Sequence, residues 1–168
     1  MHMRIPGLAL LTSLALSLGA CDQAALDNLK VGVSTEADVI KYLGQPERIW
    51  PESGGARTFE YDRQPQGVRN YMVTIGADGR MTALEQVLTP ANFARVQPGM
   101  DAEAVQRLLG KPARKVPYKL KNQIVWTWKF LEPPNETKGF DVVFGPNERV
   151  ISSAVGPNPD GPDSVGGG

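Results

Sequence analysis

The sequence contains one histidine and one cysteine, and both lie near its N-terminus. His2 and Cys21 are the only residues of their kinds among 168. The chain after them has no imidazole or thiolate for a Ser-His-Asp or Cys-His catalytic site, a zinc site or haem ligation. It also lacks the cysteines for a disulfide, so we expect the core alone to stabilise the fold. We therefore expect no enzyme, no metal and no cofactor.

The first 20 residues have the features of a secretory signal peptide. A short basic region with Arg4 precedes an apolar run of about 14 residues, whereas a membrane-spanning helix needs roughly 20. The segment Leu18-Gly19-Ala20-Cys21 resembles the bacterial lipobox, which implies that Cys21 is lipidated and that residues 21–25 form a tether. The alternative is a free thiol that happens to follow a signal peptide.

Lipidation would place the protein on the periplasmic face of a bacterial cell envelope, with its acyl chains in a membrane. Asp22 follows the cysteine directly. In enterobacterial lipoproteins, an aspartate at this position resembles a signal for retention in the inner membrane. Other bacteria read the position differently, so the sequence leaves the choice of inner or outer membrane open.

The rest of the chain repeats one pattern of helix signals. "KYLGQP" (41–46) and "RLLGKP" (107–112) each end a short amphipathic segment with a glycine and a proline, 66 positions apart. Thr35 and Asp101 stand before these segments, where a side chain that accepts the first free amides of a helix belongs. Each half therefore has a capped helix, and an apolar segment before it predicts a shorter leading helix.

The strand signals repeat as well. Aromatic and polar residues alternate over 58–62 and 126–130, and a hairpin pattern follows over 72–87 and 141–156. The sequence therefore predicts an α+β fold, a tandem of two αα-βββ units with antiparallel sheets and short helices packed on one face. We expect one body, with the sheets edge to edge or both helix pairs on one face. The predicted units span 26–88 and 89–155, and residues 156–168 form a disordered tail.

A resemblance to a known family rests on the second unit. Residues 95–101 (RVQPGMD), Val105 and residues 109–112 (LGKP) look like the opening of the SmpA/OmlA (BamE-like) lipoprotein family, and Gly32 begins a degraded copy of the same turn. The resemblance implies a role in outer-membrane β-barrel assembly or envelope integrity, with the β-barrel assembly machinery as partner. The tandem architecture is also similar to the β-lactamase inhibitory proteins, which implies inhibition of an enzyme.

Acidic residues form two close pairs, to which we assign structural roles. Glu60 and Asp62 share one face of a strand that we expect to be exposed, and Glu36 and Asp38 lie at a helix N-terminus, where negative charge is favourable. We expect neither pair to be catalytic.

Basic residues are concentrated in one stretch, since residues 104–131 contain no aspartate or glutamate. A basic surface with aromatic residues binds anionic lipid headgroups or an acidic protein partner. The alternative is a solvated face whose tryptophans lie in the core. The candidate binding surface comprises Lys111, Arg114, Lys115, Tyr118, Lys119, Lys121, Trp126 and Trp128.

The sequence thus favours a non-catalytic, lipid-anchored envelope protein that acts as a scaffold or binding module, with no nucleic acid partner. The alternative is a tethered inhibitor of a periplasmic enzyme. In that case a concave sheet would present aromatic anchors to the enzyme. These would be Phe59, Tyr61, Trp126 and Trp128.

Overall fold

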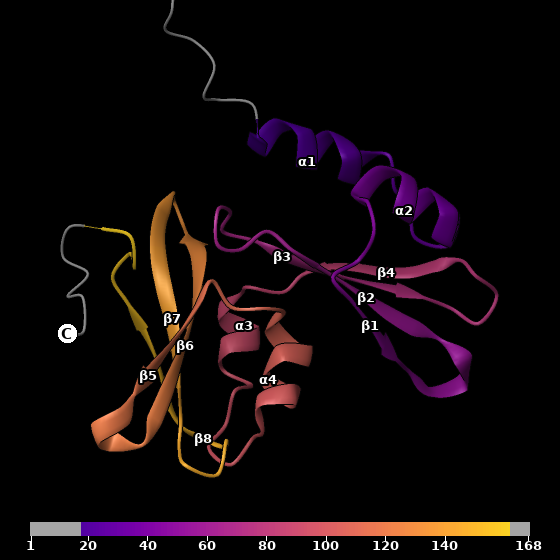
Figure 1. The fold of residues 1–168 in the computed structure, drawn as a ribbon. Helices are drawn as coiled ribbons and strands as arrows, with labels where there is room; N and C mark the ends of the chain where they lie inside the picture. Colours follow the sequence, from indigo (N-terminus) through magenta and orange to yellow (C-terminus); the bar gives the residue numbers. More distant parts are fainter. Residues whose placement is uncertain (1–17, 162–168) are drawn as a thin grey trace, which may run out of the picture.

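The computed structural model describes residues 18–161, which form two similar units in tandem (Figure 1). In the first unit two helices precede an antiparallel sheet with the strand order β1-β2-β3-β4. Its elements are α1 (Leu18–Asp27), α2 (Glu36–Leu43), β1 (Arg48–Pro51), the 3₁₀ turn η1 (Ser53–Gly55), β2 (Arg57–Asp62), β3 (Asn70–Ile75) and β4 (Met81–Gln86).

The second unit repeats this order, and its sheet runs β5-β6-β7-β8. Its elements are α3 (Pro90–Phe93), α4 (Ala102–Leu109), β5 (Arg114–Tyr118), the 3₁₀ turn η2 (Lys119–Lys121), β6 (Gln123–Glu132), β7 (Glu136–Phe144) and β8 (Val150–Gly156). The predicted α+β tandem is confirmed, but each sheet has four strands where the sequence predicts three. The additional strands, β1 and β5, are short edge strands that form directly after the Gly-x-Pro helix ends.

The predicted helix caps form as the sequence indicates. The Thr35 hydroxyl accepts the Asp38 amide. The Asp38 carboxylate accepts hydrogen bonds from the backbone amide and from the hydroxyl of Thr35, and these two bonds lower the pKa of Asp38. In the second unit Asp101 accepts the Ala104 amide at 2.8 Å. Gly44 and Gly110 follow the two helices with φ of 85° and 76°, backbone angles that favour glycine.

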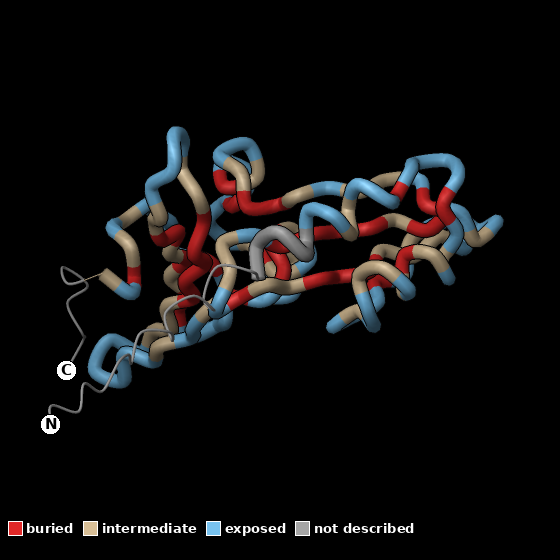
Figure 2. The backbone as a smooth tube through the Cα atoms, turned by 90° about the horizontal axis from the view of Figure 1, so that it is seen from above, coloured by how far each residue is buried: buried red, intermediate tan, exposed pale blue. Residues whose placement is uncertain are grey.

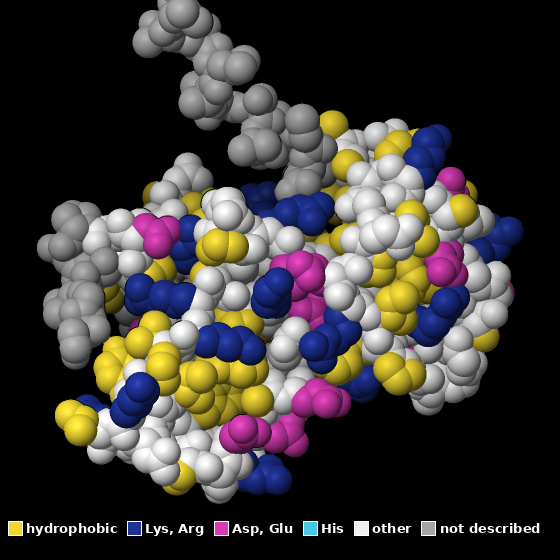
Figure 3. Space-filling model, in the orientation of Figure 1, with side chains coloured by type: hydrophobic (Ala, Val, Ile, Leu, Met, Phe, Trp, Pro, Cys, Tyr) yellow, Lys and Arg dark blue, Asp and Glu magenta, His cyan; other side chains and the backbone are white. Residues whose placement is uncertain are grey.

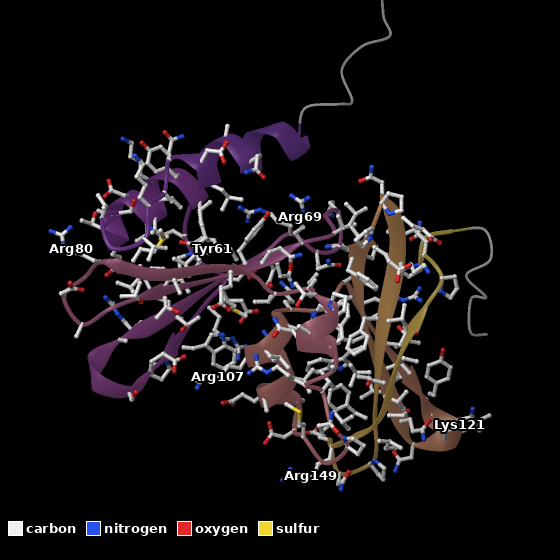
Figure 4. All side chains as sticks on the ribbon, turned by 180° about the vertical axis from the view of Figure 1, so that it is seen from behind. Tyr61, Arg69, Arg80, Arg107, Lys121 and Arg149 are labelled. Atoms are coloured by element: carbon white, nitrogen blue, oxygen red, sulfur yellow. The ribbon has the colours of Figure 1, made fainter. Side chains whose placement is uncertain are left out.

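The repeated arginines after the two hairpin turns have one role in both units. Arg80 donates a hydrogen bond to the Val33 carbonyl at 3.0 Å, and Arg149 donates one to the Gly99 carbonyl at 2.9 Å. Figure 4 shows Arg80 and Arg149 at the turn ends of their sheets. Each arginine thereby ties the far hairpin of its unit to the turn that precedes the capped helix.

The units stack in alternating layers, with α1 and α2 outermost, then the first sheet, then α3 and α4, then the second sheet (Figure 1). This arrangement differs from both packings expected from the sequence. Helix α4 turns Val105 and Leu109 into the aromatic core of its own sheet. Its polar side, with Gln106 and Arg107, faces the first sheet. Figure 2 shows the buried residues following the strands, with exposed residues at the turns.

The two ends of the chain relate differently to the sequence predictions. The signal-peptide residues 1–17 and residues 162–168 lie outside the described residues, as does the side chain of Cys21. Residues 157–161, in contrast, fold back on the second sheet. Pro159 is buried there, and Lys129 forms an ion pair with Asp160 at 2.7 Å. This start of the tail differs from the disorder predicted from residue 156.

Candidate functional site

The eight residues of the predicted binding surface do not form one surface. Lys111, Arg114 and Lys115 line a pocket between the two units, Tyr118, Lys119 and Lys121 lie at the tip of the β5–β6 hairpin, and Trp126 and Trp128 face the core of the second unit. Figure 3 shows apolar side chains gathered at the lower left of the molecule, with lysine and arginine side chains around them.

The tryptophans are part of the core. Trp128 is fully buried and donates its indole N–H to the Gly110 carbonyl at 2.9 Å, and Trp126 packs against Phe144 with 8% of its surface exposed. Phe59 and Tyr61 are likewise buried, under α1 and α2. The prediction that these four aromatic residues present a binding face is therefore wrong, because every one faces a helix layer.

The contact between the units is a polar seam around the C-terminal end of α4. The buried Asn70 donates its amide to the carbonyls of Leu109 and Lys111, at 2.9 and 3.1 Å. A second contact joins the side chain of Gln64 to the backbone N–H and C=O of Lys129 in β6. Backbone groups at the end of α4 and in β6 thus receive their hydrogen-bond partners from the first unit. These bonds fix how the two units pack against each other.

Glu60 and Asp62 lie in this seam, so the prediction of an exposed strand face is wrong. Glu60 is 1% exposed and accepts hydrogen bonds from the indole of Trp50 at 2.8 Å and from the amide of Gln106 at 3.1 Å. Asp62 accepts the Lys111 backbone amide at 2.9 Å. Burial, and then the charge of Glu60, raise the pKa of Asp62 to about 8. Asp62 therefore keeps its proton at neutral pH.

A pocket of about 360 Å³ opens beside this carboxyl pair, between β1–β2 of the first unit and the α4–β5 segment of the second. We call it the seam pocket. Its charged lining consists of Glu47, Arg48, Glu60, Asp62, Lys111, Arg114 and Lys115. Arg48 stands 66 positions before Arg114, at the equivalent place in the repeat. This spacing is a signal in the sequence that could have added Arg48 to the predicted basic surface.

The hairpin tip is the most exposed apolar feature of the chain that the structure describes. Leu120 is fully exposed, and Tyr118 before it is 39% exposed. Lys119 and Lys121 flank the leucine on η2, and Figure 4 shows Lys121 at the outer end of the hairpin. A leucine between two lysines was visible in the sequence, but its exposure follows only from the length of the hairpin.

Within residues 18–161, no three His, Cys, Asp or Glu side chains lie close enough together to hold a metal ion. No helix in that range has the length and apolar character needed to cross a membrane.

Comparisons with known proteins give weak likenesses. No family model matches the chain, and no curated protein does. The resemblance to the SmpA/OmlA family therefore gains no support. Among solved structures, a DUF4309 family protein from Bacillus subtilis is 18% identical, with 82% of this chain and 93% of that chain covered and a TM-score of 0.30. A candidate β-lactamase inhibitor protein from Streptococcus mutans is 9% identical, with 82% and 96% covered and a TM-score of 0.36. With scores this low, neither neighbour identifies the function.

Proposed function

We propose that this protein is a non-catalytic, lipid-anchored protein of the bacterial cell envelope that binds another protein through the tip of its β5–β6 hairpin. Inhibition of a periplasmic enzyme is the function that this geometry supports best. The observation that carries the proposal is Leu120, a fully exposed apolar side chain at the end of a narrow protrusion.

An exposed leucine favours association with a partner that buries its side chain. Removing a leucine side chain from water contributes about 1.5–3 kcal/mol, and Tyr118 adds an aromatic side chain of the kind that dominates binding energies. A narrow hairpin reaches into a concave site, whereas a flat interface requires a broad patch. The cleft of an enzyme is such a concave site, and the two lysines of the tip favour an acidic one.

The direction of the hairpin favours a protein over the anchoring membrane as the partner. Helix α1, which contains Cys21, lies at one end of the molecule, and the β5–β6 tip lies at the other (Figure 1). A chain anchored at Cys21 would point this tip away from its own bilayer. The anionic lipid that the basic stretch suggests is therefore the weaker candidate.

A scaffold role in β-barrel assembly is the second candidate, which rests on the SmpA/OmlA resemblance and on the predicted lipid anchor. Both candidates use the same tip, so one experiment separates them. Leu120 is replaced by the photo-reactive residue p-benzoylphenylalanine in the full-length protein in cells, and the trapped proteins are identified. Val33, which is 62% exposed on the turn before α2, receives the same residue as the control.

Capture of a soluble periplasmic enzyme from position 120 and not from 33 supports the inhibitor, provided that the purified protein then inhibits that enzyme. The variant Leu120→Asp should lose this inhibition while keeping the circular dichroism spectrum of the parent. Capture of a barrel-assembly component, dependent on Cys21, supports the scaffold instead. Equal capture from both positions, or none from position 120, overturns the proposed use of the tip.

A further inference from the structure

The seam pocket collects basic side chains from both units. Arg48 belongs to β1, Lys111 follows α4, and Arg114 and Lys115 belong to β5. This pocket lies away from the hairpin tip, so a ligand bound in it is independent of the function proposed for that tip.

Within the described part of the chain, three of the four basic side chains form no ion pair with a carboxylate. Lys111 forms an ion pair with Glu47 at 3.3 Å. Arg114 donates to the Thr127 hydroxyl and to the Pro159 carbonyl, both at 3.4 Å. Among residues 18–161, Arg48 and Lys115 form no ion pair with a carboxylate.

The charged groups of Arg48 and Lys115 instead lie over tryptophan rings. The Arg48 guanidinium lies 4.8 Å from the ring centre of Trp50, and the Lys115 ammonium lies 3.7 Å from that of Trp126. Cation–π contacts of this kind hold a cation in place without neutralising its charge. Both side chains are solvent-exposed, so their charges remain open to a ligand.

The charges of the pocket do not balance. Four basic side chains line the pocket with three carboxyls, those of Glu47, Glu60 and Asp62. The basic side chains therefore outnumber the carboxyls, and burial, which raises the pKa of Asp62 to about 8, lowers the negative charge further. Desolvation of its ammonium group, and then repulsion from Arg48 and Lys111, lower the pKa of Lys115, so these cations are close enough to destabilise one another. A dianion between them would relieve that repulsion.

We propose that the seam pocket binds a phosphate monoester dianion, held between Arg48 of the first unit and Lys115 of the second. A dianion matches the charges of Arg48 and Lys115, which form no ion pair among the described residues, and guanidinium and ammonium groups are the usual ligands of phosphate in proteins. The volume of about 360 Å³ accommodates a small ester. Because the two cations come from different units, the ligand bridges the seam.

Isothermal titration calorimetry on the full chain, in detergent at pH 7 without phosphate buffer, tests the proposal with sn-glycerol 3-phosphate as the probe. We expect saturable binding, and none with glycerol. Arg48→Gln and Lys115→Gln should each weaken binding about tenfold, the order expected when one charge-assisted contact is lost. Lys121→Gln on the hairpin tip removes the same charge far from the pocket and should bind as the parent does.

A phosphate monoester on a lipid presents the same chemistry, so vesicles containing phosphatidic acid form a second arm. Binding to these vesicles alone, sensitive to Arg48→Gln and Lys115→Gln, assigns the pocket to a lipid headgroup, and saturation by the soluble ester assigns it to a soluble ligand. Absence of binding in both arms overturns the proposal. Equal weakening by Lys121→Gln also overturns it, because attraction by net charge would then explain the binding. Both pocket residues are exposed, so the variants should fold, which thermal unfolding checks.

Discussion

The raised pKa of Asp62 in the seam predicts that the protein loses stability as the pH rises. Asp62 keeps a proton in the folded state up to a pH of about 8, whereas the ordinary pKa of its carboxyl is 3.8. Between these values the folded state binds a proton that the unfolded state has released. The free energy of unfolding therefore falls as the pH rises from about 4 to about 8, and this contribution is constant above that range.

The variant Asp62→Asn removes the titrating group and keeps its shape. The asparagine oxygen can still accept the Lys111 amide, and the amide group does not titrate. A difference of about 4 pKa units, at about 1.4 kcal/mol each, sets an upper limit near 6 kcal/mol. Because Asp62 is only partly buried, solvent screening reduces this to about 2–3 kcal/mol.

Urea unfolding of both proteins at pH 5, 7 and 9, followed by tryptophan fluorescence, measures the effect. The stability of Asp62→Asn relative to the parent should increase by about 2–3 kcal/mol between pH 5 and pH 9. Asp78→Asn, on the exposed turn between β3 and β4, is the control and should show no such increase. A relative stability of Asp62→Asn that stays constant with pH would refute the raised pKa of Asp62.

Three further predictions concern packing. Gly110→Ala should destabilise the protein by at least about 1 kcal/mol more than Gly44→Ala: both glycines have positive φ, but only at 110 would a Cβ meet Asp62 and Asn70, at 2.5 and 2.8 Å. Equal losses in thermal unfolding would contradict a tight seam. Leu109→Ala should cost about 2–5 kcal/mol in urea unfolding, since that side chain is fully buried, and a loss below about 1 kcal/mol would contradict its burial. The three tryptophans, which are at most 8% exposed, should emit at short wavelength and resist acrylamide quenching until urea unfolds the chain, and strong quenching of the folded protein would place an indole at the surface.

Much of the fold could be predicted because its signals are local. A helix cap such as Thr35 needs only an amide three residues away, and the Gly-x-Pro ends act on the turn they follow. The repetition of these signals at nearly constant spacing identified the tandem. Strands β1 and β5 were missed because short edge segments such as RKVPY, with a proline inside, become extended only by pairing with a neighbouring strand.

The candidate site was predicted less well. The basic stretch contained three of the residues that line the seam pocket, Lys111, Arg114 and Lys115, but Arg48 joins them from a strand more than 60 residues earlier. Alternation along β6 placed Trp126 and Trp128 together on one face, yet it could not indicate that α3 and α4 cover that face. Periodicity assigns residues to faces, and the packing of layers decides which faces meet water.

The sequence by itself determined the two units, their caps, their turns and the class of the fold, because each depends on residues within a few positions of one another. Only the tertiary structure decided the order of the layers. The sequence predicts that Glu60 and Asp62 are exposed. In the structure they lie in the seam, where Trp50, Gln106 and the Lys111 amide donate hydrogen bonds to them. Polar residues become interior when distant partners satisfy them, and which partners arrive depends on how the two units pack.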